Sequence, residues 1–458
     1  MKDNTKLTVI LCLYIFFAVI NNTMFNVAIP FIQSSYDLSS GQVSLVSVIY
    51  LAIFSVGTMV YGKLADFFPI KTLYILGAGL LIGGSVIGFF STSYEVLLLG
   101  RIVQAAGGSA IPSLTMLAFN AFYSQEKRAA GMTLLASMAS LGAGGGPVLG
   151  GLITSFFGYK GLFLVTASIV VLLPFLVKLM PMSVSKKGSF DFKGCILLVG
   201  AILLFVVGLS TDSRLCLAGI FFFVLFVYDI AKAKVPFINI ALLKNKLFTT
   251  VLFIGFIAFM VSIANLFLLP MMLKQLNGMS AFAIGLSLLP GSVISFLSGN
   301  PVKRCYDKVG AIKTMQGILL LLGIAFFSIS TFSGQSYIVL AALSVFSYIG
   351  FAAIQVVIGN YMFVLLPREE VNTGMGIYNL VSFVGGAVGP ALSGKYLDLK
   401  LLPFLNIWNH GNVFADAFML LAIASAGGMV FLTVVSSYHA FPEKQTAGTM
   451  AEGEKSFS

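Results

Sequence analysis

The chain has 458 residues, of which 58% are hydrophobic and only 9% are charged, and its mean hydropathy is +1.01. A soluble globular chain carries about 25% charged residues, so this composition excludes a soluble protein and indicates one that crosses a membrane several times. The formal net charge is +11, but no basic stripe with interleaved aromatic residues accompanies it. We therefore expect the excess charge to set membrane orientation, and we expect no nucleic acid as a partner.

The N-terminus reads MKDNTKLTVILCLYIFFAVI and begins like a secretory signal peptide. The apolar run continues and lacks a small-x-small cleavage site, so we predict a first retained span. Similar runs of roughly 20 residues recur along the chain, each long enough to cross a hydrocarbon core about 30 Å thick. They are continuously apolar, which predicts an all-α polytopic membrane protein and not a β-barrel. About fourteen spans are expected, centred near residues 18, 52, 81, 107, 143, 170, 202, 222, 259, 290, 322, 348, 384 and 426.

An even number of spans places both termini on the same side of the membrane. Lys and Arg are concentrated in the loops of that side. The loops of the other side carry only Lys160, Arg214, Lys274, Lys395 and Lys400. Because positive charge is retained on the cytoplasmic side, we expect a multi-pass protein of the plasma membrane with both termini in the cytoplasm.

An internal repeat divides the chain into halves. GAGGGPVLGG (142–151) and GGAVGPALSG (385–394) share the pattern G-x-x-x-G-P-x-x-[GS]-G, and GKLADFFPIK (62–71) is echoed more weakly by CYDKVGAIK (305–313). The repeat predicts two six-span halves with an inserted pair of spans between them. We expect an N-terminal six-helix bundle over 1–182, a linker with the inserted helices over 183–235, a C-terminal six-helix bundle over 236–441, and a disordered cytoplasmic tail over 442–458.

Several classes of function lack support in the sequence. No long soluble domain interrupts the spans and no GxxxxGK[ST] phosphate loop occurs, so any driving energy is expected to come from a gradient. The cysteines lie in or beside apolar segments without paired spacing, which predicts neither a disulfide framework nor a metal site. No membrane-embedded cluster of acids, histidines or metal ligands indicates an enzyme, and no cofactor is expected.

Four stretches resemble the major facilitator superfamily, specifically its fourteen-helix drug:proton antiporter branch. INNTMFNVAIP (20–30) is similar to the first-span motif of that branch, and residues 142–151 match its motif G-x-x-x-G-P-x-x-G-G at every fixed position. Arg101 and Gln104 match the motif R-x-x-Q-G. The loop motif G-x-L-a-D-r-x-G-r-k is matched by Gly62, Leu64, Ala65, Asp66 and Lys71. The length, the inserted pair and GSFDFKG (188–194) are most similar to tetracycline efflux pumps of Gram-positive type.

Glycines four residues apart fall near one helix face, so another helix backbone can approach closely where lipid offers no hydrophobic driving force. A proline among them removes a backbone donor and favours a kink. A static packing face explains this pattern, whereas the resemblance implies a flexible hinge between the halves that seals the path against leak. The hinge residues are Gly142, Gly146, Pro147, Gly150 and Gly151, with Gly385, Gly389, Pro390 and Gly394 in the second half.

Two charged residues stand out. Asp66, at the cytoplasmic end of span two, is either a solvated loop charge or, as the resemblance implies, a latch between the halves. Arg101 lies within a span, where a cation costs at least about 2.5 to 3.5 kcal/mol, so it either faces a partner or cavity or snorkels to the outer headgroups. The resemblance implies a part in proton coupling for Arg101, with Gln104 one turn further along the same helix.

Acids that related pumps carry inside spans one, five and thirteen are missing, because Asn22, Ala143 and Gly385 stand at those positions. A carboxylate at mid-membrane would titrate, because burial raises its pKa, and it would thereby carry a proton. Coupling is then expected from one of three groups, which are Asp66, Arg101 with its partners, or Asp416 if that residue reaches a cavity.

Uncharged amides are expected either to line a substrate cavity together with Phe and Tyr or to join helices by hydrogen bonds worth about 0.6 kcal/mol each. A cavity without an acid favours a neutral, zwitterionic or anionic amphipathic substrate over a dication. The candidates are Asn21, Asn22, Asn26, Gln104, Asn265, Gln355, Asn360 and Asn379.

The expected function is secondary active export of a small amphipathic drug-like molecule, such as a tetracycline-like compound, by proton-coupled alternating access. The partners are then the small-molecule substrate, protons and the lipid bilayer, and a monomer is expected. Two alternatives stay open: export of an endogenous metabolite, siderophore or peptide, and a membrane sensor that has lost transport.

Overall fold

The computed structural model describes residues 5–183, 191–232, 240–367, 370–400, 405–406, 408–409 and 411–438. These residues are almost entirely helical. The helices are α1 (Thr5–Tyr36), α2 (Ser40–Leu64), α3 (Ile70–Phe89), α4 (Tyr94–Gly108), α5 (Ala110–Phe122), α6 (Gln125–Phe157), α7 (Gly161–Ala167), the 3₁₀ helix η1 (Ser168–Leu172), α8 (Leu173–Leu179), α9 (Phe192–Ser210), α10 (Arg214–Lys232), α11 (Ile240–Leu243), α12 (Lys246–Asn277), α13 (Ala281–Leu297), α14 (Gly299–Val309), α15 (Ala311–Thr331), α16 (Tyr337–Leu365), α17 (Val371–Leu399) and α18 (Val413–Tyr438).

The described helices confirm the predicted number of spans. Thirteen are long and apolar enough to cross a membrane, and α13 with α14, bent by 46°, makes a fourteenth. Two spans combine shorter helices, since α4 and α5 together form one span and α7, η1 and α8 form another. The boundaries predicted at 235/236 and 441/442, and the predicted tail 442–458, lie outside the described residues.

Helix ends follow local chemistry. α2 begins with a capping box, in which the Ser39 hydroxyl accepts from the Gln42 backbone N–H and the Gln42 side chain accepts from the Ser39 N–H. α13 begins with Ser280 in the same N-cap role. α12 ends at Gly278, whose φ of +63° lies in the left-handed region that glycine adopts without strain.

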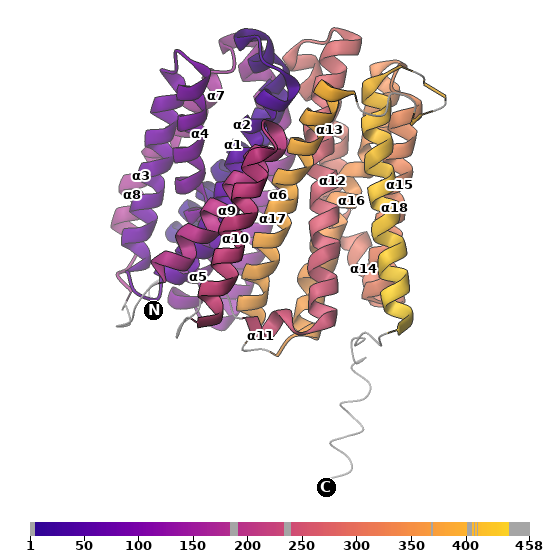
Figure 1. Cartoon of the computed structure of the whole chain (residues 1–458). Helices are drawn as coiled ribbons and strands as arrows, with labels where there is room; N and C mark the ends of the chain where they lie inside the picture. Colours follow the sequence, from indigo (N-terminus) through magenta and orange to yellow (C-terminus); the bar gives the residue numbers. More distant parts are fainter. Residues whose placement is uncertain are drawn as a thin grey trace.

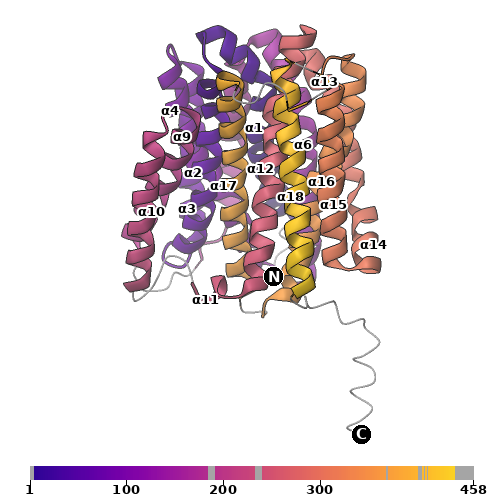
Figure 2. The same cartoon turned by 45° about the vertical axis from the view of Figure 1, so that its right-hand side comes forward.

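The spans stand side by side as an upright bundle, with α1 to α8 forming one half and α12 to α18 the other (Figure 1). We call the face where α1 begins and α18 ends the terminal face, and the opposite one the distal face. The inserted helices α9 and α10 pair with each other, and α9 packs against both α2 and α17 at the boundary between the halves (Figure 2).

Glycines of the repeated motif set the packing inside each half. In α6, Gly142, Gly146 and Gly150 face α1, and a Cβ on Gly150 would lie 2.3 Å from the carbonyl oxygen of Met24. In α17, Gly385 and Gly389 face α12 in the same way, with 2.1 Å from a Cβ on Gly389 to the Met260 carbonyl oxygen. Because real Cβ atoms do not approach backbone atoms so closely, only glycine fits at positions 150 and 389 without a shift of the facing helix.

The last glycine of each motif faces the other half instead. A Cβ on Gly151 of α6 would lie 2.4 Å from the Ala281 carbonyl oxygen of α13, and one on Gly394 of α17 would lie 2.6 Å from the Ser40 carbonyl oxygen of α2. Both contacts lie near the distal face. Towards the terminal face, the added Cβ on Gly62 of α2 or Gly376 of α17 would meet no atom within 4 Å. The halves are therefore sealed together near the distal face.

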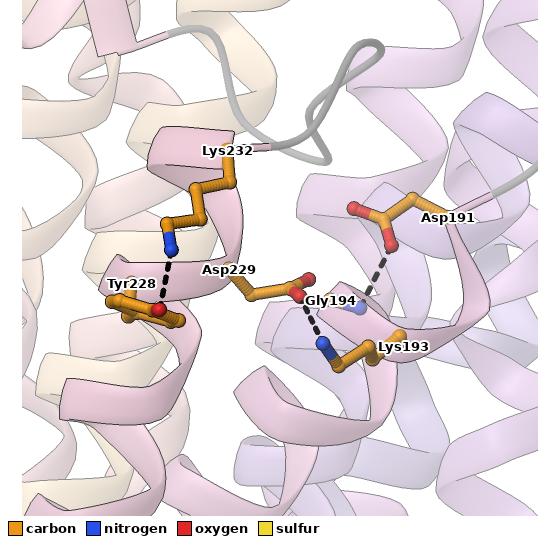
Figure 3. A network of polar contacts seen from close by, with 6 residues as sticks. All are labelled: Asp191, Lys193, Gly194, Tyr228, Asp229 and Lys232. Carbon is orange, nitrogen blue, oxygen red and sulfur yellow. Dashed lines mark hydrogen bonds and ion pairs between the residues drawn. The ribbon is translucent and has the colours of Figure 1, made fainter.

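A small polar network joins the start of α9 to the end of α10 (Figure 3). The Asp191 carboxylate accepts from the Gly194 backbone N–H at 2.8 Å and so caps α9. Lys193 of α9 pairs with Asp229 of α10, with 2.5 Å between Nζ and Oδ1. Exposed pairs of this kind contribute about 0 to 1 kcal/mol, so apolar packing is the main force between the two helices.

Candidate functional site

Arg101 of α4 lies inside the first half, with only 1% of its side chain exposed. Its Nε donates to the carbonyl oxygen of Val46 on α2 at 3.3 Å, and its Nη1 donates to Oε1 of Gln104 at 3.0 Å. A longer contact of 3.5 Å joins Nη1 to Oδ1 of Asn21 on α1. The guanidinium is thus held by partners inside the bundle and does not snorkel to the headgroups, which decides between the two sequence-based interpretations.

Two aromatic rings complete the surroundings of this cation. The guanidinium carbon lies 4.0 Å from the ring centre of Phe25 on α1 and 4.1 Å from that of Tyr50 on α2. A desolvated cation–π contact contributes about 2 kcal/mol or more. Among the described residues, no carboxylate forms an ion pair with Arg101. The positive charge is instead stabilised by carbonyl and amide oxygens and by the two ring faces.

Further hydrogen bonds extend the network to five helices. The Asn21 amide donates to the Tyr50 hydroxyl at 3.1 Å and accepts from Thr166 of α7 at 2.9 Å. Gln104 donates to the hydroxyl of Ser85 on α3 at 2.8 Å. The Arg101 network therefore ties α1, α2, α3, α4 and α7 into one unit.

Along α16, which the structure describes throughout, no cation stands at the position equivalent to Arg101. Ser336 caps α16 as Ser93 caps α4, and counting eight residues from each cap brings Ser344 to the place of Arg101. Three residues further, Ser347 accepts from the amide of Asn265 on α12 at 3.1 Å. Oδ1 of Asn265 is buried and has no partner among the described residues. The two halves thus share an architecture but differ in charge at corresponding positions.

A chain of ring contacts leads from the Arg101 network into the second half. Tyr50 stacks on Phe54 with 5.8 Å between ring centres, and Phe54 meets Phe383 of α17 edge-on at 5.2 Å. Phe383 contacts Phe259 of α12 at 5.7 Å, and Phe259 contacts Phe351 of α16 at 5.2 Å. Phe54, Phe351 and Phe383 are half-buried. This aromatic chain crosses the boundary between the halves near the middle of the spans.

The amide side chains that were predicted either to line a cavity or to join helices differ in how deeply they are buried. Asn21, Asn26, Gln104 and Asn265 are buried and hydrogen-bonded within the packed bundle, as helix-joining amides would be. Asn22 and Asn379 are half-buried.

Gln355 and Asn360 are exposed on α16. A cavity of about 210 Å³ opens near the terminal face beside Asn360, and its other lining residues are Lys303, Tyr306, Asp307, Phe363 and Val364.

The other two coupling candidates lie outside the Arg101 network. Asp66 is exposed in the turn after α2. Asp416 is 1% exposed at the distal end of α18, where its Oδ1 accepts from the backbone N–H of Asn406 at 2.9 Å. This bond ties the segment before α18 to the helix. Among the described residues, Oδ2 of Asp416 has no partner.

Sequence reasoning did not single out Phe25, Tyr50, Ser85 or Thr166. One signal was available, because Phe25 follows Asn21 by four residues and so lies on the same face of α1. The other three lie on helices whose contacts no spacing reveals.

Comparison with known proteins shows which transporters this chain is similar to. The chain is 25% identical over 428 residues to the riboflavin transporter RibZ of Clostridioides difficile, covering 91% of this chain and 93% of that one. It is 25% identical to the lincomycin resistance protein LmrB of Listeria monocytogenes, covering 82% and 83% of the two chains. It is also 25% identical to the methylenomycin A resistance protein of Bacillus subtilis, covering 93% of each.

Solved structures show the same fold. The crystal structure of a POT family transporter in complex with 5-aminolevulinic acid superposes with a TM-score of 0.69 at 14% identity, covering 94% of this chain and 96% of that one. The family model of the Major Facilitator Superfamily matches residues 11–390. With that match extending from α1 into α17, the chain belongs to the Major Facilitator Superfamily.

Proposed function

We propose that this transporter is a secondary active exporter of small amphipathic molecules that are neutral or anionic, working by alternating access as a monomer. The observation that carries the proposal is the buried Arg101 network, which places an unpaired positive charge at one end of the aromatic chain. A fixed charge in a medium of low dielectric repels a cationic cargo and attracts an anionic one. The half-buried rings of Phe54 and Phe383 offer a surface on which a flat cargo stacks.

The charge of the loops and the seal between the halves support an assignment of the two faces. Because positive charge is retained in the cytoplasm, the Lys- and Arg-rich loops favour a cytoplasmic position for the terminal face. Halves sealed near the distal face then correspond to a state that is closed to the outside. Proton antiport is the proposed driving force, with Arg101, Gln104 and Asp66 as the coupling residues and the motif glycines as the hinge.

Transport by everted vesicles of three dyes of similar size, one neutral, one anionic and one cationic, tests the cargo class. We expect the parent protein to accumulate the neutral and anionic dyes and to reject the cationic one. Arg101→Gln should weaken that preference, while Arg128→Gln, at a half-buried arginine of α6 outside the Arg101 network, should keep it. Best transport of the cationic dye by the parent would contradict the proposal.

A second candidate function is transport of a metabolite. It is favoured by the relative named as a riboflavin transporter, which matches nearly the whole chain. The two functions separate in cells with and without the gene. Unchanged tolerance to lincomycin, tetracycline and similar compounds, together with a changed distribution of riboflavin or another metabolite between cells and medium, would favour the second.

A further inference from the structure

Two corners seal the distal face, and they are related by the internal repeat. At the first, which we call the α13 corner, Gly151 of α6 meets the start of α13. At the second, the α2 corner, Gly394 of α17 meets the start of α2. The residue four positions after each glycine then reaches the first backbone N–H groups of the facing helix. These residues are Ser155 at the α13 corner and Asp398 at the α2 corner.

The α13 corner is held by a neutral contact. The hydroxyl of Ser155 accepts from the backbone N–H of Phe282 at 2.8 Å. Backbones touch beside it, because a Cβ on Gly285 would lie 2.5 Å from the Pro147 carbonyl oxygen. One hydrogen bond and close backbone packing therefore join α6 to α13.

The α2 corner is held by a carboxylate. Asp398 accepts from the Ser39 hydroxyl and from the backbone N–H groups of Ser40 and Gly41, each at 2.8 Å. Free N–H groups and the positive end of the helix dipole make a helix start a favourable place for an anion. The Asp398 side chain is exposed, so solvent screens its charge. It nevertheless accepts three hydrogen bonds where Ser155 accepts one, and charge-assisted bonds are the stronger kind, so we expect this corner to be the stronger of the two.

The inserted pair reinforces the α2 corner. The hydroxyl of Ser44 on α2 donates to that of Ser210 on α9 at 3.2 Å. Lys395 of α17 donates to the carbonyl oxygen of Thr211, which follows α9 directly. The distal end of α9 is thus bonded to both halves, and the repeat supplies no counterpart at the α13 corner.

We propose that Asp398 is the lock of the distal gate and that α9 is a clamp on it. Together they stabilise the state in which the distal face is closed, and opening of that face requires the Asp398 carboxylate to leave the start of α2. The inference rests on alternating access in the proposed function. Its test needs no cargo, so it fails or succeeds independently of the proposed substrate class.

The test follows labelling of a cysteine placed at Ala391, which is fully buried beneath the α2 corner. The four native cysteines, Cys12, Cys195, Cys216 and Cys305, are first replaced, and the protein is placed in lipid nanodiscs. In Asp398→Ser, which copies the chemistry of the α13 corner, we expect a maleimide to react with this cysteine about ten times faster. Tenfold corresponds to about 1.4 kcal/mol.

A second set of variants places the carboxylate at the α13 corner, alone or in exchange for the one at the α2 corner. Ser155→Asp alone should slow the labelling below the parent rate, and Asp398→Ser with Ser155→Asp should return it towards the parent. Lys395→Met, which removes only the bond to α9, should raise the rate about threefold. Asp212→Asn serves as the matched control, because Asp212 accepts from the Arg214 N–H within the inserted pair and joins no halves.

The proposed role of Asp398 as the lock is contradicted if the labelling rate in Asp398→Ser equals that of the parent. It is also contradicted if Asp212→Asn raises the rate as much. Parent-like labelling in Lys395→Met overturns the clamp. If Asp398→Ser does not fold, the single variant Ser155→Asp still decides, since a second charged corner must slow the labelling.

Discussion

At the scale of single residues, Arg101 shows how a cation is accommodated in a membrane-spanning bundle without an acid. Insertion of a cation costs at least about 2.5 to 3.5 kcal/mol, and the structure offsets this cost with hydrogen bonds and two ring contacts. A lysine cannot reproduce this arrangement, because its ammonium is a strongly hydrated point charge without a planar face. We therefore expect the site to require arginine and not only a positive charge.

Arg101→Lys should reduce transport at least tenfold and lower the melting temperature by several degrees. The variant keeps the charge but removes the guanidinium donor of Gln104 Oε1, and an unpaired buried polar group costs about 1 to 3 kcal/mol. Transport in vesicles and thermal unfolding in detergent measure the two effects. Arg128→Lys, at a half-buried arginine outside the Arg101 network, should match the parent, and full activity of Arg101→Lys would contradict a site fitted to arginine.

The variant Asp416→Asn distinguishes two possible roles of Asp416, which are holding the segment before α18 and carrying a proton. The amide oxygen of Asn accepts from the Asn406 N–H as the carboxylate does, so the segment before α18 stays attached. We expect at least half of the parent transport and an unchanged pH profile. Loss of proton-driven transport with normal folding would instead make Asp416 the proton carrier.

At the scale of helices, the sequence predicted the glycine motifs but not the direction in which each glycine faces. Spacing by four identifies a face of a helix, and Gly142, Gly146 and Gly150 do share one against α1. The next residue, Gly151, lies about 100° further round the helix and faces the other half. One motif thus serves both packing within a half and contact between halves, and only the fold shows which glycine does which.

Gly150→Ala should destabilise the protein by about 1 to 3 kcal/mol and abolish transport, because its methyl group would overlap the Met24 carbonyl and force α6 away from α1. Gly145→Ala is the matched control on the same helix, since a Cβ there meets no atom within 4 Å. Thermal unfolding of the two variants measures the difference. Equal melting temperatures would show that α6 and α1 have room to adjust.

The bend and the breaks in the spans were beyond the sequence analysis, as was the role of Asp398. Periodicity predicted about fourteen spans, but nothing in it marked the 46° bend between α13 and α14. The sequence analysis did not single out Asp398, which lies at the end of an apolar run. Its three partners stand more than 350 residues away in the chain, a separation across which spacing carries no information.

At the scale of the whole molecule, the charge of the loops predicts which side of the membrane each face meets. Lys127 and Lys308 lie towards the terminal face and Asp212 towards the distal one, so cysteines at these positions report orientation. In intact cells, an impermeant maleimide should label a cysteine at 212 and leave those at 127 and 308 unlabelled until the membrane is opened. The reverse pattern would overturn the cytoplasmic assignment of the termini.

The charged α2 corner has a consequence for the resting state of the transporter. Without the Asp398 carboxylate, both corners of the distal face would be held by neutral contacts and close backbone packing. Under the proposed lock, the carboxylate adds to the closure of the distal face, so the empty protein rests with its terminal face accessible. Cargo then meets a ready site, and the gradient is needed chiefly for the stroke that pulls the Asp398 carboxylate away from α2.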